Sequence, residues 1–254
     1  MNKLFKVFSM VVMLVMGGQA MAQTRGAMFL GVSFPIMDFA EYEGSYNNFA
    51  LNTRNGTDAA ADMGYNAGLK GYFNVGVKGL GVMVSADGFY NGPNKELKKE
   101  YREQEGVYYG VTNSGYANYN STPIYVNVPV MLGLNYIYHF NPNLGIYVEA
   151  GAGGNMRLIT DMEYVIKGTL MEESELYEYD RAFSFAYQAG IGLEVAKHLV
   201  IGLSFYDLGS ADVETVHTYT TNYLELDRII TVSHPETYGT IRPIMVLGRI
   251  GFSF

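Results

Sequence analysis

Apolar residues recur at every second position over several long stretches of the chain. Between Tyr125 and Phe140 one set of alternate positions is apolar or aromatic, whereas the other set carries asparagine, glycine, methionine and histidine. Period-2 alternation of this kind indicates a β-strand with one apolar face. Residues 144–160 and 181–196 repeat the pattern, with charged residues and glycine on the second face. The chain is therefore predicted to be all-β.

The strands are separated by connections of two kinds. Links of a few residues at 75–78, 141–143 and 197–198 alternate with long polar connections. Short turns on one side and long loops on the other are typical of antiparallel up-and-down barrels in bacterial outer membranes, where the turns are periplasmic and the loops extracellular. We predict four long extracellular loops, near 36–61, 92–122, 161–180 and 211–237, and eight strands, at 26–35, 62–74, 79–91, 123–140, 144–160, 181–196, 199–210 and 238–254. The alternative is a ten-stranded barrel with an extra hairpin in one of the first two long connections.

The apolar strand faces are expected to point outward, into lipid. After the N-terminal region the chain has no apolar run of helical spanning length, and lipid tolerates only helices and closed barrels. A soluble lipocalin-like barrel is the structural competitor. Against it stand Tyr136, Tyr138 and Phe140, which precede a short turn. Aromatic rings at strand ends suit a membrane interface.

The first residues have the composition of a secretory signal. Lys3 and Lys6 precede an apolar run from Val7 to Met16, and Ala20 and Ala22 form a small-x-small cleavage site. Residues 1–22 are predicted to be a signal peptide removed before Gln23, which leaves 23–254 as the barrel domain. Cleavage changes the net charge from −8 to −10, because it removes two lysines and no acid. An acidic exported chain argues against nucleic acid as a partner.

The chain contains no cysteine. A disulfide scaffold, a zinc-thiolate site and a cysteine nucleophile are therefore excluded. No cofactor and no metal are expected.

Charged residues also fall on the inward strand faces. Burying charges is costly unless they are paired, and an eight-stranded barrel is just wide enough for side chains to fill it. We predict a salt-bridge network centred on Lys70, Glu149, Glu194 and Arg249. The network either plugs the lumen structurally or gates a pore. The predicted inward charges are Lys70, Asp87, Glu149, Arg157, Glu194 and Arg249.

A catalytic site is not expected. Outer-membrane enzymes need a histidine near a serine, or paired acids, at the outer rim. Only His217 and His234 lie on that side, and Ser233 directly precedes His234, so the two side chains should point apart. Glu214 could reach His217 only through a turn. We predict no catalytic residues.

The long connections give further hints of surface contacts. Residues 172–180 are rich in acids, which indicates either a cation-binding cluster or, more simply, a solvated surface. Residues 95–105 alternate basic and acidic side chains, a pattern that favours a short helix. The following tyrosine-rich segment up to Tyr119 suits either a recognition surface or an extended strand rim.

The C-terminal segment Arg249–Phe254 alternates and ends on an aromatic residue. Ile250, Phe252 and Phe254 point one way, and this ending resembles the insertion signal of Gram-negative outer-membrane barrels. The same resemblance is carried by the signal peptide, the eight alternating strands and segments such as 127–135 and 145–151. With these features, the mature chain is similar to the small outer-membrane β-barrel superfamily, which includes the OmpA transmembrane domain and OmpX-type proteins.

That resemblance implies a location and partners, but no active site. It implies residence in the outer membrane of a Gram-negative bacterium, contact with membrane lipid and lipopolysaccharide, and barrel assembly machinery and periplasmic chaperones as partners during biogenesis. A monomer with a structural or surface-interaction role is expected, with an extracellular ligand bound through the loops. The alternatives are a small-solute channel and, less favoured, an enzyme acting on lipid.

Overall fold

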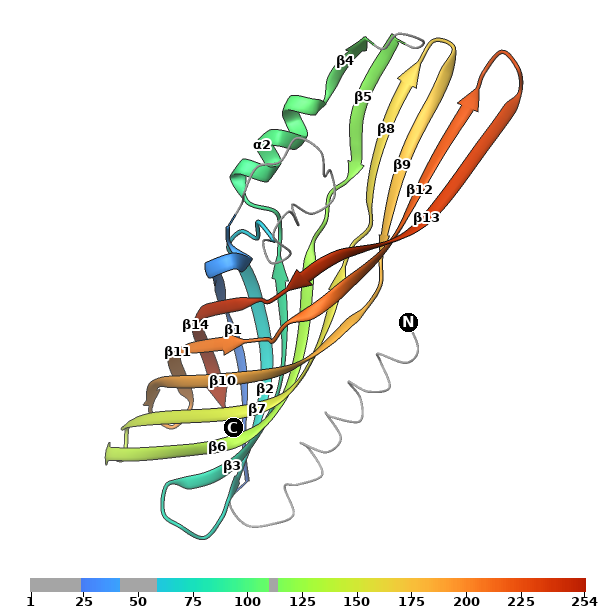
Figure 1. The fold of residues 1–254 in the computed structure, drawn as a ribbon. Coiled ribbons are helices and arrows are strands. Elements are labelled where there is room, and N and C mark those ends of the chain that lie inside the picture. Colours follow the sequence, from blue (N-terminus) through green and yellow to red (C-terminus); the bar gives the residue numbers. More distant parts are fainter. Residues whose placement is uncertain (1–23, 42–58, 110–113) are drawn as a thin grey trace.

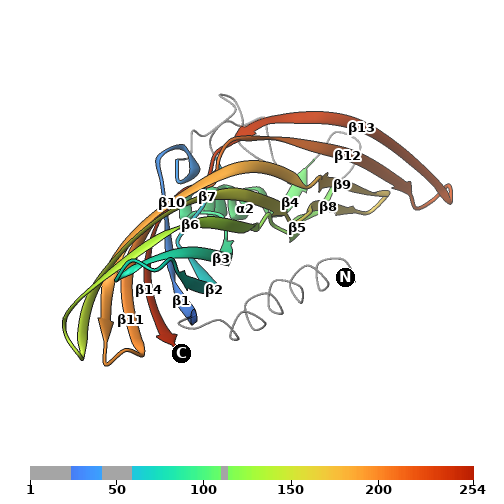
Figure 2. The same ribbon diagram turned by 90° about the horizontal axis from the view of Figure 1, so that it is seen from below.

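The computed structural model describes residues 24–41, 59–109 and 114–254, and these form a closed antiparallel β-barrel of eight strands (Figures 1 and 2). The barrel strands are β1 (Thr24–Ile36), β2 (Gly64–Asn74), β3 (Leu80–Asn91), β6 (Tyr125–Asn141), β7 (Leu144–Ile159), β10 (Ala182–Val195), β11 (Leu199–Asp207) and β14 (Ile244–Ser253). The predicted up-and-down barrel is confirmed, and the barrel has eight strands rather than ten.

The barrel closes where the first strand meets the last. Ala27 lies opposite Ser253 and Ile36 lies opposite Ile244, so β1 and β14 pair along ten residues. The order around the barrel is β1-β14-β11-β10-β7-β6-β3-β2. Closure removes the unpaired edges that an open sheet would leave. The short turns and both ends of the described chain lie at one end of the barrel, here called the turn end (Figure 1).

Alternate residues face outward and into the lumen, as the sequence pattern predicts. On β6, Leu132 is 62% exposed, whereas its neighbour Met131 is 1% exposed. Tyr136, Tyr138 and Phe140 are exposed on the same outer face, near the turn end. The exterior is thus apolar and aromatic, which is the arrangement of a barrel that faces lipid and the inverse of a soluble barrel.

Within the described residues, the long connections near 92–122, 161–180 and 211–237 contain regular strands. At the end opposite the turns they form a six-stranded sheet, here called the projecting sheet, in the order β13-β12-β9-β8-β5-β4. It extends beyond the barrel in Figure 1. Its strands are β4 (Gly106–Tyr109), β5 (Ser114–Ser121), β8 (Met162–Gly168), β9 (Met171–Tyr179), β12 (Ala211–Tyr223) and β13 (Arg228–Ile241).

The expected single strand over residues 238–254 is wrong in one respect. It is divided into β13 and β14 by Arg242 and Pro243. Proline cannot donate a hydrogen bond to a sheet ladder, so the chain leaves one sheet and enters another there. β11 and β12 are likewise divided at residues 208–210.

A short helix, α2 (Lys95–Gln104), lies at the foot of the projecting sheet, as the charge pattern predicted. The Asn94 side chain accepts a hydrogen bond from the Leu97 amide and so caps its first turn. Leu97 packs with Met162 and Tyr177 of the sheet. Within the described ranges, no helix has both the length and the apolar character needed to cross a bilayer. A 3₁₀ turn, η2 (Met37–Phe39), follows β1.

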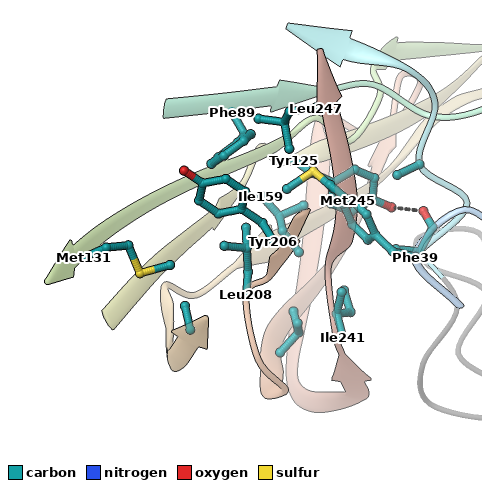
Figure 3. Close-up of a cluster of buried hydrophobic side chains, with 14 residues drawn as sticks. Phe39, Phe89, Tyr125, Met131, Ile159, Tyr206, Leu208, Ile241, Met245 and Leu247 are labelled. Carbon is teal, nitrogen blue, oxygen red and sulfur yellow. Dashed lines mark hydrogen bonds between the residues drawn. The ribbon is translucent and has the colours of Figure 1, made fainter. Parts of the chain in front are cut away.

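An apolar cluster fills the barrel at the end that carries the projecting sheet (Figure 3). Phe39 from η2 packs edge-on against Tyr125, with ring centroids 5.6 Å apart. The Tyr125 hydroxyl donates to the carbonyl oxygen of Ala59, which ties Ala59 and the nearby Ala61 onto the cluster. The other large members are Phe89, Met131, Ile159, Tyr206, Leu208, Ile241, Met245 and Leu247.

Candidate functional site

The middle of the lumen holds a hydrogen-bonded triangle of Arg249, Asp87 and Tyr206. The Arg249 guanidinium donates to Asp87 at 2.9 Å and to the Tyr206 hydroxyl at 2.7 Å. That hydroxyl in turn donates to the second oxygen of Asp87 at 2.9 Å. The Arg249 and Asp87 side chains are 2% and 0% exposed, so the pair is held away from solvent. Both carboxylate oxygens are satisfied, which is the condition for burying such a pair.

A second ion pair, between Lys70 and Glu149, lies beside this triangle. The Lys70 ammonium donates to Glu149, and both side chains are buried. The Phe29 ring lies near both cations, 5.3 Å from the Lys70 nitrogen and 5.7 Å from the Arg249 guanidinium carbon. An aromatic face near a desolvated cation adds electrostatic stabilisation. The two pairs therefore form one packed layer across the lumen.

A third ionic group lies toward the turn end. Arg25 donates to one oxygen of Glu194, and the His139 ring nitrogen lies 3.1 Å from the other. The Arg25 guanidinium also covers the Tyr72 ring at 4.7 Å. Arg25 was not among the predicted inward charges, because the predicted first strand began at Gly26. Extending the period-2 alternation of β1 by one residue places Arg25 on the lumen face. The sequence pattern therefore contained the information needed to identify Arg25 as an inward charge.

Arg157 is buried in the lumen wall but belongs to none of these ion pairs. Its guanidinium donates to the carbonyl oxygens of Ile241 at 2.7 Å and Gly209 at 3.1 Å, and its Nε donates to the Asn127 amide oxygen at 3.4 Å. Ile241 and Gly209 lie at two of the places where the chain passes between the barrel and the projecting sheet, namely β13 to β14 and β11 to β12. Arg157 thus serves as a clamp at the junction rather than a member of the charge layer.

Other contacts fix the same junction. Gly209 has a positive φ of 71°, and a Cβ there would lie 2.0 Å from the carbonyl oxygen of Phe185. Only glycine fits this position without strain. Arg242 donates to both carboxylate oxygens of Asp207 across the break. The projecting sheet is therefore attached at a defined geometry.

The two faces of the projecting sheet differ in composition. One face carries cross-strand hydroxyl pairs, with Thr218 and Ser233 2.9 Å apart and Thr220 and Thr231 3.3 Å apart. It also carries a hollow of about 260 Å³ lined mainly by polar side chains. Because residues directly opposite in a ladder share a face, the register assigns the carboxylates of Glu173 and Glu175 to the other face.

The predicted histidine candidates lie on that other face. His217 is directly opposite His234, stacks on Tyr177 at 4.2 Å, and has its ring nitrogen 3.6 Å from Glu175. The turn that could have brought Glu214 to His217 does not form: the two residues are three apart on the same strand, β12, and so face opposite sides. Ser233 lies opposite Thr218 and faces away from His234. Among the described residues no group of three or more potential ligands could hold a metal ion.

The C-terminal residues Ile250, Phe252 and Phe254 are all exposed on the outer face of the barrel. Their role as an insertion signal stays a prediction. Ala20 and Ala22, the predicted cleavage site, lie outside the described residues.

Comparison with known proteins gives weak likenesses to membrane barrels. No protein-family model matches the chain. No curated protein matches it either. Among solved structures, the attachment invasion locus protein Ail of Yersinia pestis has a TM-score of 0.40 at 13% identity, covering 91% of this chain and 99% of that one. One structure of Ail contains the heparin analogue sucrose octasulfate.

Two further solved structures show the same kind of similarity. A major outer membrane protein from Thermus thermophilus has a TM-score of 0.42 at 9% identity, with 91% of this chain and 99% of that one covered. The toluene transporter TodX of P. putida has a TM-score of 0.20 at 10% identity, with 92% and 90% covered. At these values the likenesses transfer no activity to this chain. The closed eight-stranded barrel with an apolar exterior itself confirms the fold expected of small outer-membrane β-barrels.

Proposed function

We propose that this chain is an outer-membrane protein whose filled barrel anchors the projecting sheet at the bacterial surface, where the sheet makes contacts with molecules outside the cell. The turn end faces the periplasm and the projecting sheet faces outward, in accord with the usual orientation of such barrels. The role is structural and interactive rather than catalytic. Enzymatic action on lipid is not proposed, because the candidate histidines and Ser233 form no nucleophile-base pair.

The observation that carries this proposal is the contrast between the lumen and the projecting sheet. Past the rim, the connections between barrel strands form a separate six-stranded sheet, while the lumen beneath is occupied by ion pairs and an apolar cluster. A pore would need a continuous water path past Glu149, Arg249 and Arg157. Glu149 and Arg249 lie in the packed charge layer, and Arg157 is hydrogen bonded to the lumen wall. The filled lumen therefore favours an anchor over the small-solute channel.

The exterior supports the membrane part of the proposal. Exposed leucine, valine and phenylalanine side chains surround the barrel, and tyrosines lie near its turn end. Burying such side chains in lipid is worth about 1.5–3 kcal/mol each. We infer contact with outer-membrane lipid and lipopolysaccharide, export through a cleaved signal peptide, assembly by the barrel assembly machinery with periplasmic chaperones, and a monomeric protein.

The proposal is tested by removing the outer part of the projecting sheet and keeping the barrel. In the shortened variant, residues 215–236 of the β12–β13 hairpin and residues 163–176 of the β8–β9 hairpin are each replaced by a two-residue Asn-Gly turn, which suits a hairpin and keeps the paired residues on either side of each cut. Cells of a Gram-negative host displaying the native chain or this variant are compared for retention on surfaces coated with extracellular matrix protein or polysaccharide. The barrel of each is checked by the gel mobility of unheated samples. We expect retention by the native chain alone, and equal retention by a folded shortened variant would refute a surface role for the sheet.

A further inference from the structure

The polar face of the projecting sheet contains a hollow that the anchoring of the barrel does not explain. The hollow has a volume of about 260 Å³ and crosses β5, β8, β9, β12 and β13. Its polar lining includes Asn120, Glu163, Lys167, Glu172, Ser174 and Thr220. Its size is near the lower end of the range for small-molecule sites, about 300 Å³, so it would take a short segment of a longer ligand.

The lining groups are mixed donors and acceptors. Asn120 donates to Glu163 at 2.8 Å and accepts from Asn118 at 2.9 Å, so this carboxylate is held in position by an amide chain. Hydroxyl and amide groups both donate and accept hydrogen bonds. A ligand that matches them must itself present many groups that do both, and a sugar ring does so.

The charges of the hollow argue against strongly charged ligands. Lys167 lies 4.0 Å from Glu172, so these two largely offset each other. Glu163 remains, and its position disfavours a sulfated or phosphorylated ligand by like-charge repulsion. Glu163 is a single carboxylate that already accepts a hydrogen bond from Asn120, so it would attract a polycation only weakly. The balance therefore favours a neutral ligand.

Apolar surface for the C–H faces of a sugar is also present. Val165 forms part of the lining and is buried, whereas Ile229 also lines the hollow and is 67% exposed. Tyr116 lies directly opposite Lys167 in the ladder, and so on the same face, with 56% of its surface exposed. A rigid aromatic ring beside polar groups gives contact area at low entropy cost.

We infer that this hollow binds a neutral, polyhydroxylated glycan. The inference rests on the proposed surface role of the projecting sheet and names the chemical class of its ligand. Glu163 and Asn120 would bind sugar hydroxyls, and Thr220 would exchange hydrogen bonds with them. Ile229 and Tyr116 would contact the C–H faces. Such a glycan could belong to the cell's own lipopolysaccharide or to a foreign surface.

The test is a direct binding measurement on the refolded full barrel in a detergent without a sugar headgroup. Saturation-transfer NMR and titration calorimetry are run with maltotriose, cellotriose, mannotriose and N-acetylchitotriose. A second arm uses the polysaccharide released from lipopolysaccharide of the expressing strain, which distinguishes the two sources. Sucrose octasulfate and trilysine are the charged comparison ligands.

The variants separate the two sheet faces. Glu163→Gln and Thr220→Val alter the hollow, whereas Glu173→Gln makes the same carboxylate-to-amide change on the opposite face, beside Glu172. We expect at least one neutral saccharide to bind, about 10-fold weaker binding for Glu163→Gln because a charged hydrogen bond is lost, and unchanged binding for Glu173→Gln.

Three results would overturn the inference. The first is that no neutral saccharide binds at about 10 mM, a concentration beyond any useful affinity. The second is that Glu173→Gln weakens binding as much as Glu163→Gln does. The third is that a charged comparison ligand binds and the neutral saccharides do not. If the saccharides fail while the shortened variant still loses surface retention, the ligand class is wrong and the surface role stands. If retention is unchanged as well, the surface role itself fails.

Discussion

The lumen of the barrel buries its polar side chains in contacts with one another, whereas the projecting sheet leaves polar side chains exposed. In the lumen, Arg249 and Asp87 are almost fully buried and share a closed set of hydrogen bonds with Tyr206. In the sheet, Lys167 and Glu172 lie 4.0 Å apart with 67% and 41% of their side chains exposed. The first arrangement satisfies its charges internally, and the second leaves polar groups available to a ligand.

This difference shows where stability and recognition reside in the molecule. Removing one partner of a buried pair leaves an uncompensated charge, whereas an exposed pair contributes little. Changes in the lumen should therefore affect folding, and changes in the projecting sheet should affect binding with little effect on folding.

The largest effect is expected for Arg249→Met. The substitution leaves the Asp87 carboxylate buried without its cation, which should lower the free energy of unfolding by about 3–5 kcal/mol. Urea unfolding of the barrel in phospholipid vesicles measures it. The double variant Arg249→Met with Asp87→Leu should recover much of the loss, because no charge is then left unpaired. A single variant as stable as the native chain would show that the lumen is wet.

Arg157→Met should have the next largest effect and should act at the junction. Two carbonyl oxygens, of Gly209 and Ile241, lose a charged donor, so we expect a loss of about 2–3 kcal/mol. Hydrogen exchange should rise first at residues 208–210 and 241–244, because these lie where the projecting sheet joins the barrel. An increase spread evenly over the barrel would contradict the assignment of Arg157 as a junction clamp.

Gly202→Ala should cost less, about 1–2 kcal/mol, because it overpacks the lumen. A Cβ at this position would lie 2.1 Å from the Tyr147 hydroxyl oxygen. Adding Tyr147→Phe removes that oxygen and should restore most of the stability. Gly248→Ala is the matched control, since a Cβ there meets nothing within 4 Å. Equal losses for both alanine variants, measured by urea unfolding, would exclude the packing explanation.

The smallest effect on stability is expected in the projecting sheet. Lys167→Met breaks an exposed pair, so the free energy of unfolding should change by about 0–1 kcal/mol. The same urea titration measures it, with the Arg249→Met variant as the reference for a buried pair. A loss as large as that of Arg249→Met would remove the distinction between the two regions.

The barrel could be predicted from the sequence because membrane strands alternate strictly. The alternation at Val130, Leu132 and Leu134 identified both the strand and its outer face, and a short link such as 141–143 identified the turn end. The eight strands were placed within a few residues of their observed bounds, except that the last began too early, inside β13.

Most of the projecting sheet was not predicted, for a physical reason; only the tyrosine-rich segment up to Tyr119, part of which is β5, was considered as an extended strand rim. Much of its surface is exposed to water, so no strict apolar alternation marks its strands, and polarity alone suggested loops. The β-branched and aromatic residues at 215–221 were the available signal, since such residues favour strands. Contacts such as Arg157 with the carbonyl oxygens of Gly209 and Ile241 lie beyond sequence reasoning, because they depend on where the chain changes sheets.

The central claim is that the lumen is filled and that the barrel serves as an anchor. Single-channel recording of the refolded native chain in a planar bilayer tests it most directly, with Glu149→Gln and Arg249→Gln measured alongside. The account predicts no stable conductance steps from the native chain, once its folded state is verified by gel mobility. Stable steps that carry small solutes, altered by either substitution, would contradict it and make the protein a channel.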